Sequence, residues 1–136
     1  MARSASLSQR LLQLDGAFLA FASAPAMVVE TIGHYRGVGP FARNLGSPYT
    51  IGGFEAHGLA LIFAVLLLRA ARLDERHIWH WVALVIHLFL GAANLLFWAS
   101  FVYMDVVPMG VVATTVHALF VVAHVVTLRV APTSPR

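Results

Sequence analysis

Long apolar stretches, separated by short polar connections, fill almost the whole chain. They cover residues 11–32, 49–68, 81–103 and 106–128. Each stretch approaches or exceeds the roughly 20 residues that a helix needs to cross the hydrocarbon core of a bilayer. Lipid cannot hydrogen-bond to the backbone, so within a span of this kind only a helix can satisfy the backbone N–H and C=O groups. The pattern predicts one all-α domain, an integral-membrane four-helix bundle.

The first apolar stretch also has some features of a secretory signal peptide. Arg3 and Arg10 precede it, and the small residues 22–24 resemble a cleavage site. However, Pro25 would then begin the mature chain, and Asp15 interrupts the apolar region. We therefore expect this stretch to be retained as a spanning helix that bends at Pro25.

The arginine residues predict the orientation of the bundle. Residues 33–48 are rich in glycine and proline and contain Arg36 and Arg43, whereas the connection around Asp105 contains no arginine. By the positive-inside rule, both termini are expected in the cytoplasm, and the predicted location is the inner membrane of a bacterium, as a multi-pass protein. The remaining arginines lie near the termini and in the second connection: Arg3, Arg10, Arg69, Arg72, Arg76, Arg129 and Arg136.

Composition narrows the classes of function. Hydrophobic residues make up 60% of the chain and charged residues 11%, which excludes an ordinary soluble domain. Cysteine is absent, which excludes disulfides, thiolate catalysis, iron–sulfur clusters and covalently attached haem. The net charge of +3 comes from arginines that flank apolar spans, so we expect contact with lipid headgroups and no nucleic-acid partner.

Polar residues in the last two stretches predict a specific pairing of helices. A connection of only a couple of residues around Asp105 would force an antiparallel hairpin. Residues whose numbers add to about 211 would then lie at the same depth. His87 would face His124, and Asn94 would face His117, with both residues of each helix on one face because they are seven apart.

Several interpretations of these pairs stay open. They could be interhelical hydrogen bonds that fix the pairing of the helices. His87 and His124 could instead form a proton relay or act as metal ligands, although the sequence shows no firm third ligand at their depth. Haem b is a further alternative, for which a diagonal pair such as His57 with His117 would suit the spacing of packed helices better than directly facing positions.

The second stretch adds two ionisable residues. Glu55 lies about five residues inside it, roughly 8 Å below the membrane surface at 1.5 Å per residue. His57 lies about 200° further around the helix, so both side chains cannot point into the bundle. We expect Glu55 to point inward and His57 to flank it, and Glu55, Asn94 and His117 to hold the polar head of a ligand beside Trp98.

Residues 48–61 resemble the second helix of DoxX-like membrane proteins. The stretch runs from Pro48 through Gly52, Gly53 and Glu55 to Leu61. In that family a short loop ending near a proline leads into an apolar helix with an early glycine and a glutamate. The resemblance implies a small four-helix bundle with both termini inside, a loose link to respiratory quinone chemistry, and a Glu55 that faces the bundle.

Three classes of function follow. The first is a non-enzymatic membrane protein that binds a small amphipathic ligand, such as a quinone or lipid. The second is a redox protein that binds haem b or a metal ion. The third is a structural subunit that assembles with a membrane-complex partner or as a homo-oligomer. No Ser–His–Asp or similar hydrolytic arrangement can be recognised, so no catalytic residue is assigned.

Overall fold

The computed structural model describes residues 6–130, and this part of the chain is helical apart from short connections. Four of its helices are long and apolar enough to cross a membrane. The predicted all-helical fold with four helices that could span a membrane is thereby confirmed for the described residues. The elements in order are α1 (Leu7–Arg36), η1 (Ala42–Asn44), α2 (Thr50–Ala70), α3 (Arg76–Leu96), α4 (Trp98–Tyr103) and α5 (Val107–Val130).

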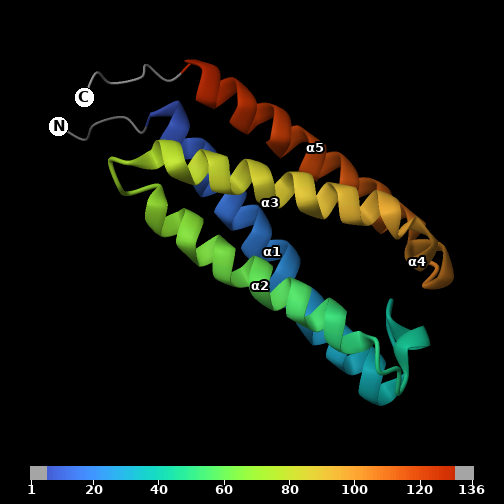
Figure 1. Ribbon diagram of the computed structural model, residues 1–136. Coiled ribbons are helices and arrows are strands. Elements are labelled where there is room, and N and C mark those ends of the chain that lie inside the picture. The colour runs from blue at the N-terminus through green and yellow to red at the C-terminus, as the bar shows by residue number, and fades with distance from the viewer. Residues whose placement is uncertain (1–5, 131–136) are drawn as a thin grey trace.

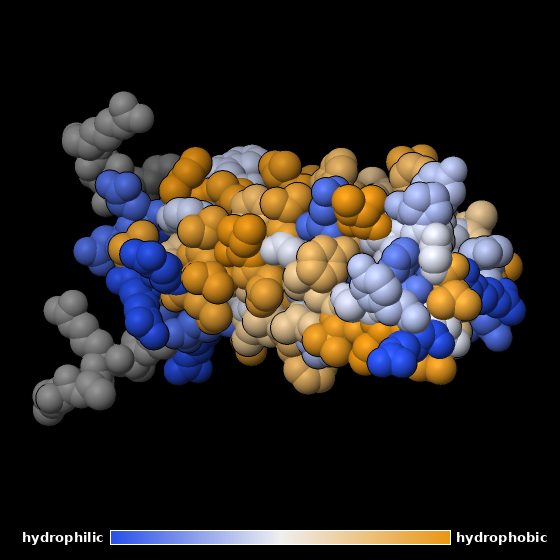
Figure 2. Space-filling view, turned by 90° about the horizontal axis from the view of Figure 1, so that it is seen from below, coloured by the Kyte–Doolittle hydropathy of each residue, from blue (hydrophilic) through white to orange (hydrophobic). Residues whose placement is uncertain are grey.

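The surface has the polarity of a membrane protein. Hydrophobic residues cover the middle of the face in Figure 2, and hydrophilic residues gather at its two ends. We call the end with the first turn of α1 and the α2–α3 turn the terminal end, and the end with η1 and α4 the loop end. Assignment of the terminal end to the cytoplasm, and of the bilayer to a bacterial inner membrane, stays a prediction.

Helix α1 is longer than the sequence predicts. It begins at Leu7, where the side chain of Ser6 accepts a hydrogen bond from the backbone N–H of Gln9 at 3.2 Å. The helix continues through Pro25 and ends at Gly37, whose positive φ of 62° suits glycine. Its 30 residues give a length of about 45 Å, enough to extend beyond the hydrocarbon core.

The helices are arranged as two hairpins (Figure 1), with α1 packed mainly on α2, and α3 mainly on α5. Gly16 permits the close approach of the first pair, because a Cβ there would lie 2.9 Å from the carbonyl oxygen of Ala64. The buried apolar core lies toward the terminal end and includes Leu12, Leu19 and Leu67. The neighbouring residue Asp15 therefore enters a tightly packed region.

The predicted pairing of α3 with α5 is shifted by about one helical turn, since Gly91 faces His117 and His87 stacks on Phe120. We expected one helix to continue to residue 103, but α3 ends at Leu96 and the short helix α4 follows after Phe97. Because α4 belongs to the connection, the hairpin turns back earlier. His87 meets His117, and His80 meets His124. The numbers of these hydrogen-bonded pairs add to 204 rather than to 211, and His80, just outside the predicted span 81–103, is buried against His124.

Candidate functional site

A fully buried carboxylate lies at the junction of three helices. Asp15 on α1 has no exposed surface. Its Oδ1 lies 2.8 Å from Nε2 of His87 on α3, and its Oδ2 lies 2.9 Å from Nε2 of His124 on α5. Both imidazoles are also completely buried. One aspartate thus joins the two hairpins through both of its oxygens.

Two further histidines extend these contacts. Nδ1 of His87 lies 2.8 Å from Nδ1 of His117, and Nδ1 of His124 lies 2.9 Å from Nδ1 of His80. Beyond this second pair, Nε2 of His80 lies 2.7 Å from the hydroxyl of Ser8. We call this set the histidine–aspartate network: Ser8, Asp15, His80, His87, His117 and His124.

One assignment of protons satisfies every contact in the network. A neutral imidazole has one N–H donor and one acceptor nitrogen. His87 and His124 then donate from Nε2 to Asp15, and their Nδ1 atoms accept from His117 and His80. The Ser8 hydroxyl donates to Nε2 of His80. Every hydrogen bond in this arrangement is donated in the direction of the carboxylate of Asp15. This alignment of donors stabilises the negative charge of the carboxylate in a medium of low polarity.

The sequence identified three of these histidines but missed the residue at the centre. His87, His117 and His124 do come together, although His87 contacts His124 by ring stacking, with centroids 6.2 Å apart. From the sequence, Asp15 was treated only as an interruption of the first apolar stretch. An ionisable residue inside a span is itself a signal of a functional site, and that signal points to Asp15.

The predicted roles of Glu55 and His57 are reversed. Glu55 is exposed on the surface of α2, whereas His57 faces α1. Nδ1 of His57 lies 3.1 Å from Oε2 of Glu30 and 3.0 Å from the carbonyl oxygen of Gly53. Glu30 is buried and needs a donor from α2, and this requirement fixes how α2 is rotated. Because Glu55 lies about 200° around the helix from His57, its side chain is then on the outer surface of the bundle.

Glu55 is exposed and so does not lie in the bundle interior, where a polar pocket with Asn94 and His117 was expected. Asn94 and Trp98 are half-buried, and His117 belongs to the network with His87. His57 has its own partner, Glu30, on α1. The proposed diagonal pair of His57 and His117 therefore consists of two side chains with different neighbours, and the structure gives no support to it as a pair of haem ligands.

The donor atoms of three buried residues lie close enough together to hold a metal ion. One donor atom each from Asp15, His87 and His124 lies within 4.8 Å of the other two. A tetrahedral ion with bonds of about 2.0–2.2 Å holds its ligands roughly 3.3–3.5 Å apart, so the contacts of 2.8 and 2.9 Å to Asp15 would have to open by about 0.5 Å.

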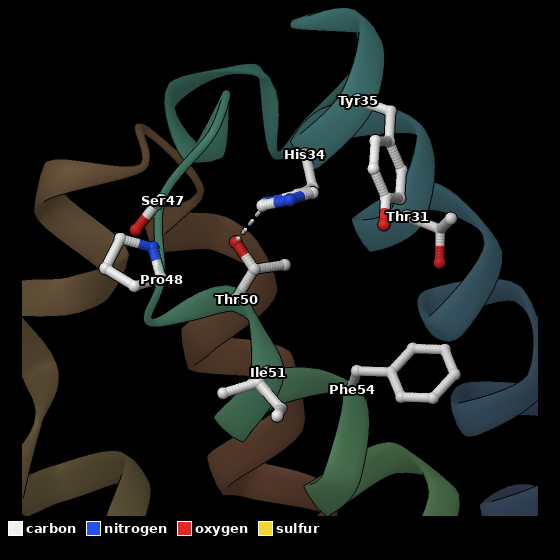
Figure 3. Close-up of a pocket in the computed structure, with 8 residues that line it drawn as sticks. All are labelled: Thr31, His34, Tyr35, Ser47, Pro48, Thr50, Ile51 and Phe54. Atoms are coloured by element: carbon white, nitrogen blue, oxygen red, sulfur yellow. Dashed lines mark hydrogen bonds between the residues drawn. The ribbon is translucent and has the colours of Figure 1, made fainter.

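A cavity of about 400 Å³ lies elsewhere, at the loop end between α1, the following loop and the start of α2. Figure 3 shows the imidazole of His34 pointing at the hydroxyl of Thr50, with which it forms a hydrogen bond of 3.3 Å. Its walls combine hydroxyl groups with apolar side chains. The residues that line it are Thr31, His34, Tyr35, Ser47, Pro48, Thr50, Ile51 and Phe54.

No family model matches the chain, and comparisons with curated proteins and with solved structures find no match. The resemblance of residues 48–61 to DoxX-like proteins accordingly stays a prediction.

Proposed function

We propose that this membrane protein binds a divalent transition-metal ion through Asp15, His87 and His124. The observation that carries the proposal is the convergence of two imidazole Nε2 atoms on the two oxygens of one buried carboxylate. The three residues come from three helices. Two histidines and one carboxylate form a donor set that suits ions such as Zn²⁺ and Fe²⁺ and leaves coordination positions open.

The outer histidines support this role. If a metal ion took Nε2 of His87 and of His124, each of these rings would carry its proton on Nδ1. The Nδ1 atoms of His117 and His80, 2.8 and 2.9 Å away, would then be the acceptors, with the proton of each outer ring on its own Nε2. Hydrogen bonds of this kind hold a metal-bound imidazole in one tautomer and one orientation. The network therefore supplies both the ligands and the groups that orient them.

The first test is metal binding by the purified protein. Stripped protein in detergent, titrated with Co²⁺, should develop visible d–d absorption at one ion per chain, and Zn²⁺ should displace it. Asp15→Asn should weaken binding by about 100-fold or more, because an amide is a poor ligand and the negative charge is lost.

Asp74→Asn is the matched control, because Asp74 is an exposed aspartate in the α2–α3 turn. It should bind Co²⁺ as the unaltered protein does. Equal binding by Asp15→Asn and the unaltered protein would contradict the proposal, as would the absence of any saturable Co²⁺ spectrum.

A second candidate function is favoured by the cavity at the loop end. Its volume of about 400 Å³ and its mixture of hydroxyl groups and apolar walls suit a small amphipathic ligand, the class that the sequence also predicted. The exposed rings of Tyr35 and Phe54 place its mouth on the outer surface of the bundle. A quinone or lipid could reach it from the bilayer.

Melting temperature in the presence of decylubiquinone tests this candidate. A ligand at 100 times its Kd stabilises the folded state by about 2.7 kcal/mol, which gives a measurable rise. Thr50→Val should abolish the rise, because Thr50 supplies a buried hydroxyl to the cavity. Thr114→Val on α5 is the control and should retain it. A melting temperature independent of the quinone would count against a quinone ligand.

A further inference from the structure

We infer that the buried site exchanges its metal ion with water at the terminal end of the bundle, by way of Ser8 and His80. The inference rests on the proposed metal site. It adds a route and a direction of access, which the donor set alone does not give. In this view His80 is a positioning residue that holds the ion briefly between the surface and the three ligands.

A continuous series of polar contacts leads from the surface to the site. Ser8 is half-buried in the first turn of α1, and its hydroxyl lies 2.7 Å from Nε2 of His80. His80 contacts His124, which contacts Asp15, at 2.9 Å in each case. From Ser8 to Asp15 the helix rises only about 10 Å. An ion that follows this route always has a nitrogen or oxygen ligand within reach.

The opposite side of the site offers no comparable series among the described residues. The network ends at His117, which packs against the edge of the Phe18 ring with centroids 6.2 Å apart. Phe120 stacks on His87 at 4.7 Å and contacts Phe18 at 5.4 Å. His117 also lies ten residues inside α5, about 15 Å from the start of that helix. Aromatic side chains, rather than ligands, border this side.

Charges at the terminal end affect how fast an ion arrives. Arg10 is exposed there and Arg76 half-buried, and both repel a cation, whereas Asp74 and Glu75 in the same region attract it. These charges face water and act over about 10 Å at moderate ionic strength. They alter the rate of approach but not the side from which the ion comes.

His80 and His117 provide a matched comparison, because each touches one ligand histidine through an equivalent Nδ1 contact. Stopped-flow spectroscopy would follow Co²⁺ association, and its removal by a chelator, in His80→Phe and His117→Phe. Each substitution removes a contact that orients one ligand histidine, so both should raise Kd. Only His80→Phe should also slow association by about tenfold or more, whereas His117→Phe should leave the association rate within about twofold.

Two results would overturn the route: association in His80→Phe as fast as in the unaltered protein, or equal slowing in His117→Phe. A failure of the proposed metal site would give a different result, because the unaltered protein would then show no saturable Co²⁺ binding at equilibrium. That result would also rule out the route.

A second variant avoids replacing a buried residue. The natural chain contains no cysteine, so Ser8→Cys introduces a single thiol at the surface end of the route. Modification with a bulky maleimide should slow Co²⁺ exchange about tenfold or more. Ser47→Cys at the loop end, modified in the same way, should exchange Co²⁺ at the unmodified rate. Unchanged exchange in modified Ser8→Cys would contradict the route independently of His80.

Discussion

At the scale of single residues, the structure shows how a bilayer protein tolerates buried ionisable groups. Asp15 and Glu30 both lie on α1, and each is held by histidine from another helix. Every buried polar side-chain atom in the described residues has a hydrogen-bond partner. Removal of one member of a buried pair costs about 3–5 kcal/mol, because the other charge is left without compensation. These residues therefore constrain the packing of the helices as well as offering chemistry.

The neighbouring glycines Gly52 and Gly53 allow the Glu30 contact to be tested. A Cβ at Gly53 would lie 2.5 Å from Oε1 of Glu30, whereas a Cβ at Gly52 meets no atom within 4 Å. Gly53→Ala should displace the carboxylate from His57 and lower the free energy of unfolding by about 1–2 kcal/mol relative to Gly52→Ala. Denaturant unfolding in detergent micelles measures the difference.

Gly52→Ala is the control because it makes the same change of helix propensity in open space. It should leave stability unchanged or raise it by up to about 1 kcal/mol. Equal stability of the two variants would show that the carboxylate moves aside without losing its hydrogen bond.

At the scale of the elements, the end of one helix decides which side chains meet. Phe97 interrupts the helical run, and α4 turns what the hydropathy pattern shows as one span into a long helix and a short one. Hydropathy does not detect this break, because Leu95, Leu96 and Phe97 are as apolar as the residues around them. The pairing of α3 and α5 consequently moves by about one turn, and His80 joins the network through His124.

Engineered disulfides should distinguish the two pairings. An ideal Cβ at Gly91 lies 3.5 Å from Cβ of His117, within the range that a disulfide requires. Gly91→Cys with His117→Cys should therefore crosslink under mild oxidation, which is visible as a shift in electrophoretic mobility. Gly91→Cys with Phe120→Cys, the pair that the sequence-based sum of 211 would favour, should crosslink poorly. The reverse result would contradict the observed pairing and restore the predicted one.

At the scale of the whole molecule, two polar regions lie toward opposite ends of the bundle. The histidine–aspartate network occupies the part near the terminal end, and the cavity beside Thr50 lies at the loop end. On α1, Asp15 and Thr31, which lines the cavity, are separated by about 24 Å of helix. Sites at this distance without shared partners should respond to substitution independently. We therefore expect that the proposed metal site and the proposed ligand cavity can be altered one at a time.

The sequence by itself determined the class of this protein and much of its chemistry. Four apolar stretches were sufficient to predict four long helices, because the requirement to satisfy the backbone in lipid acts on each segment separately. The spacing of seven residues between His87 and Asn94, and between His117 and His124, correctly placed His87, His117 and His124 on inward faces. These properties depend only on residues near one another in the chain.

Only the tertiary structure decided which of these residues form a site. The burial of Asp15, its two bonds to His87 and His124, and the exposure of Glu55 depend on where the helices end and how they are rotated. Those quantities follow from packing between segments far apart in sequence, such as α1 against α5. Hydropathy measures how apolar a segment is, but it says little about how the helix is rotated around its axis. A network with residues from three helices therefore forms only when the two hairpins pack against each other.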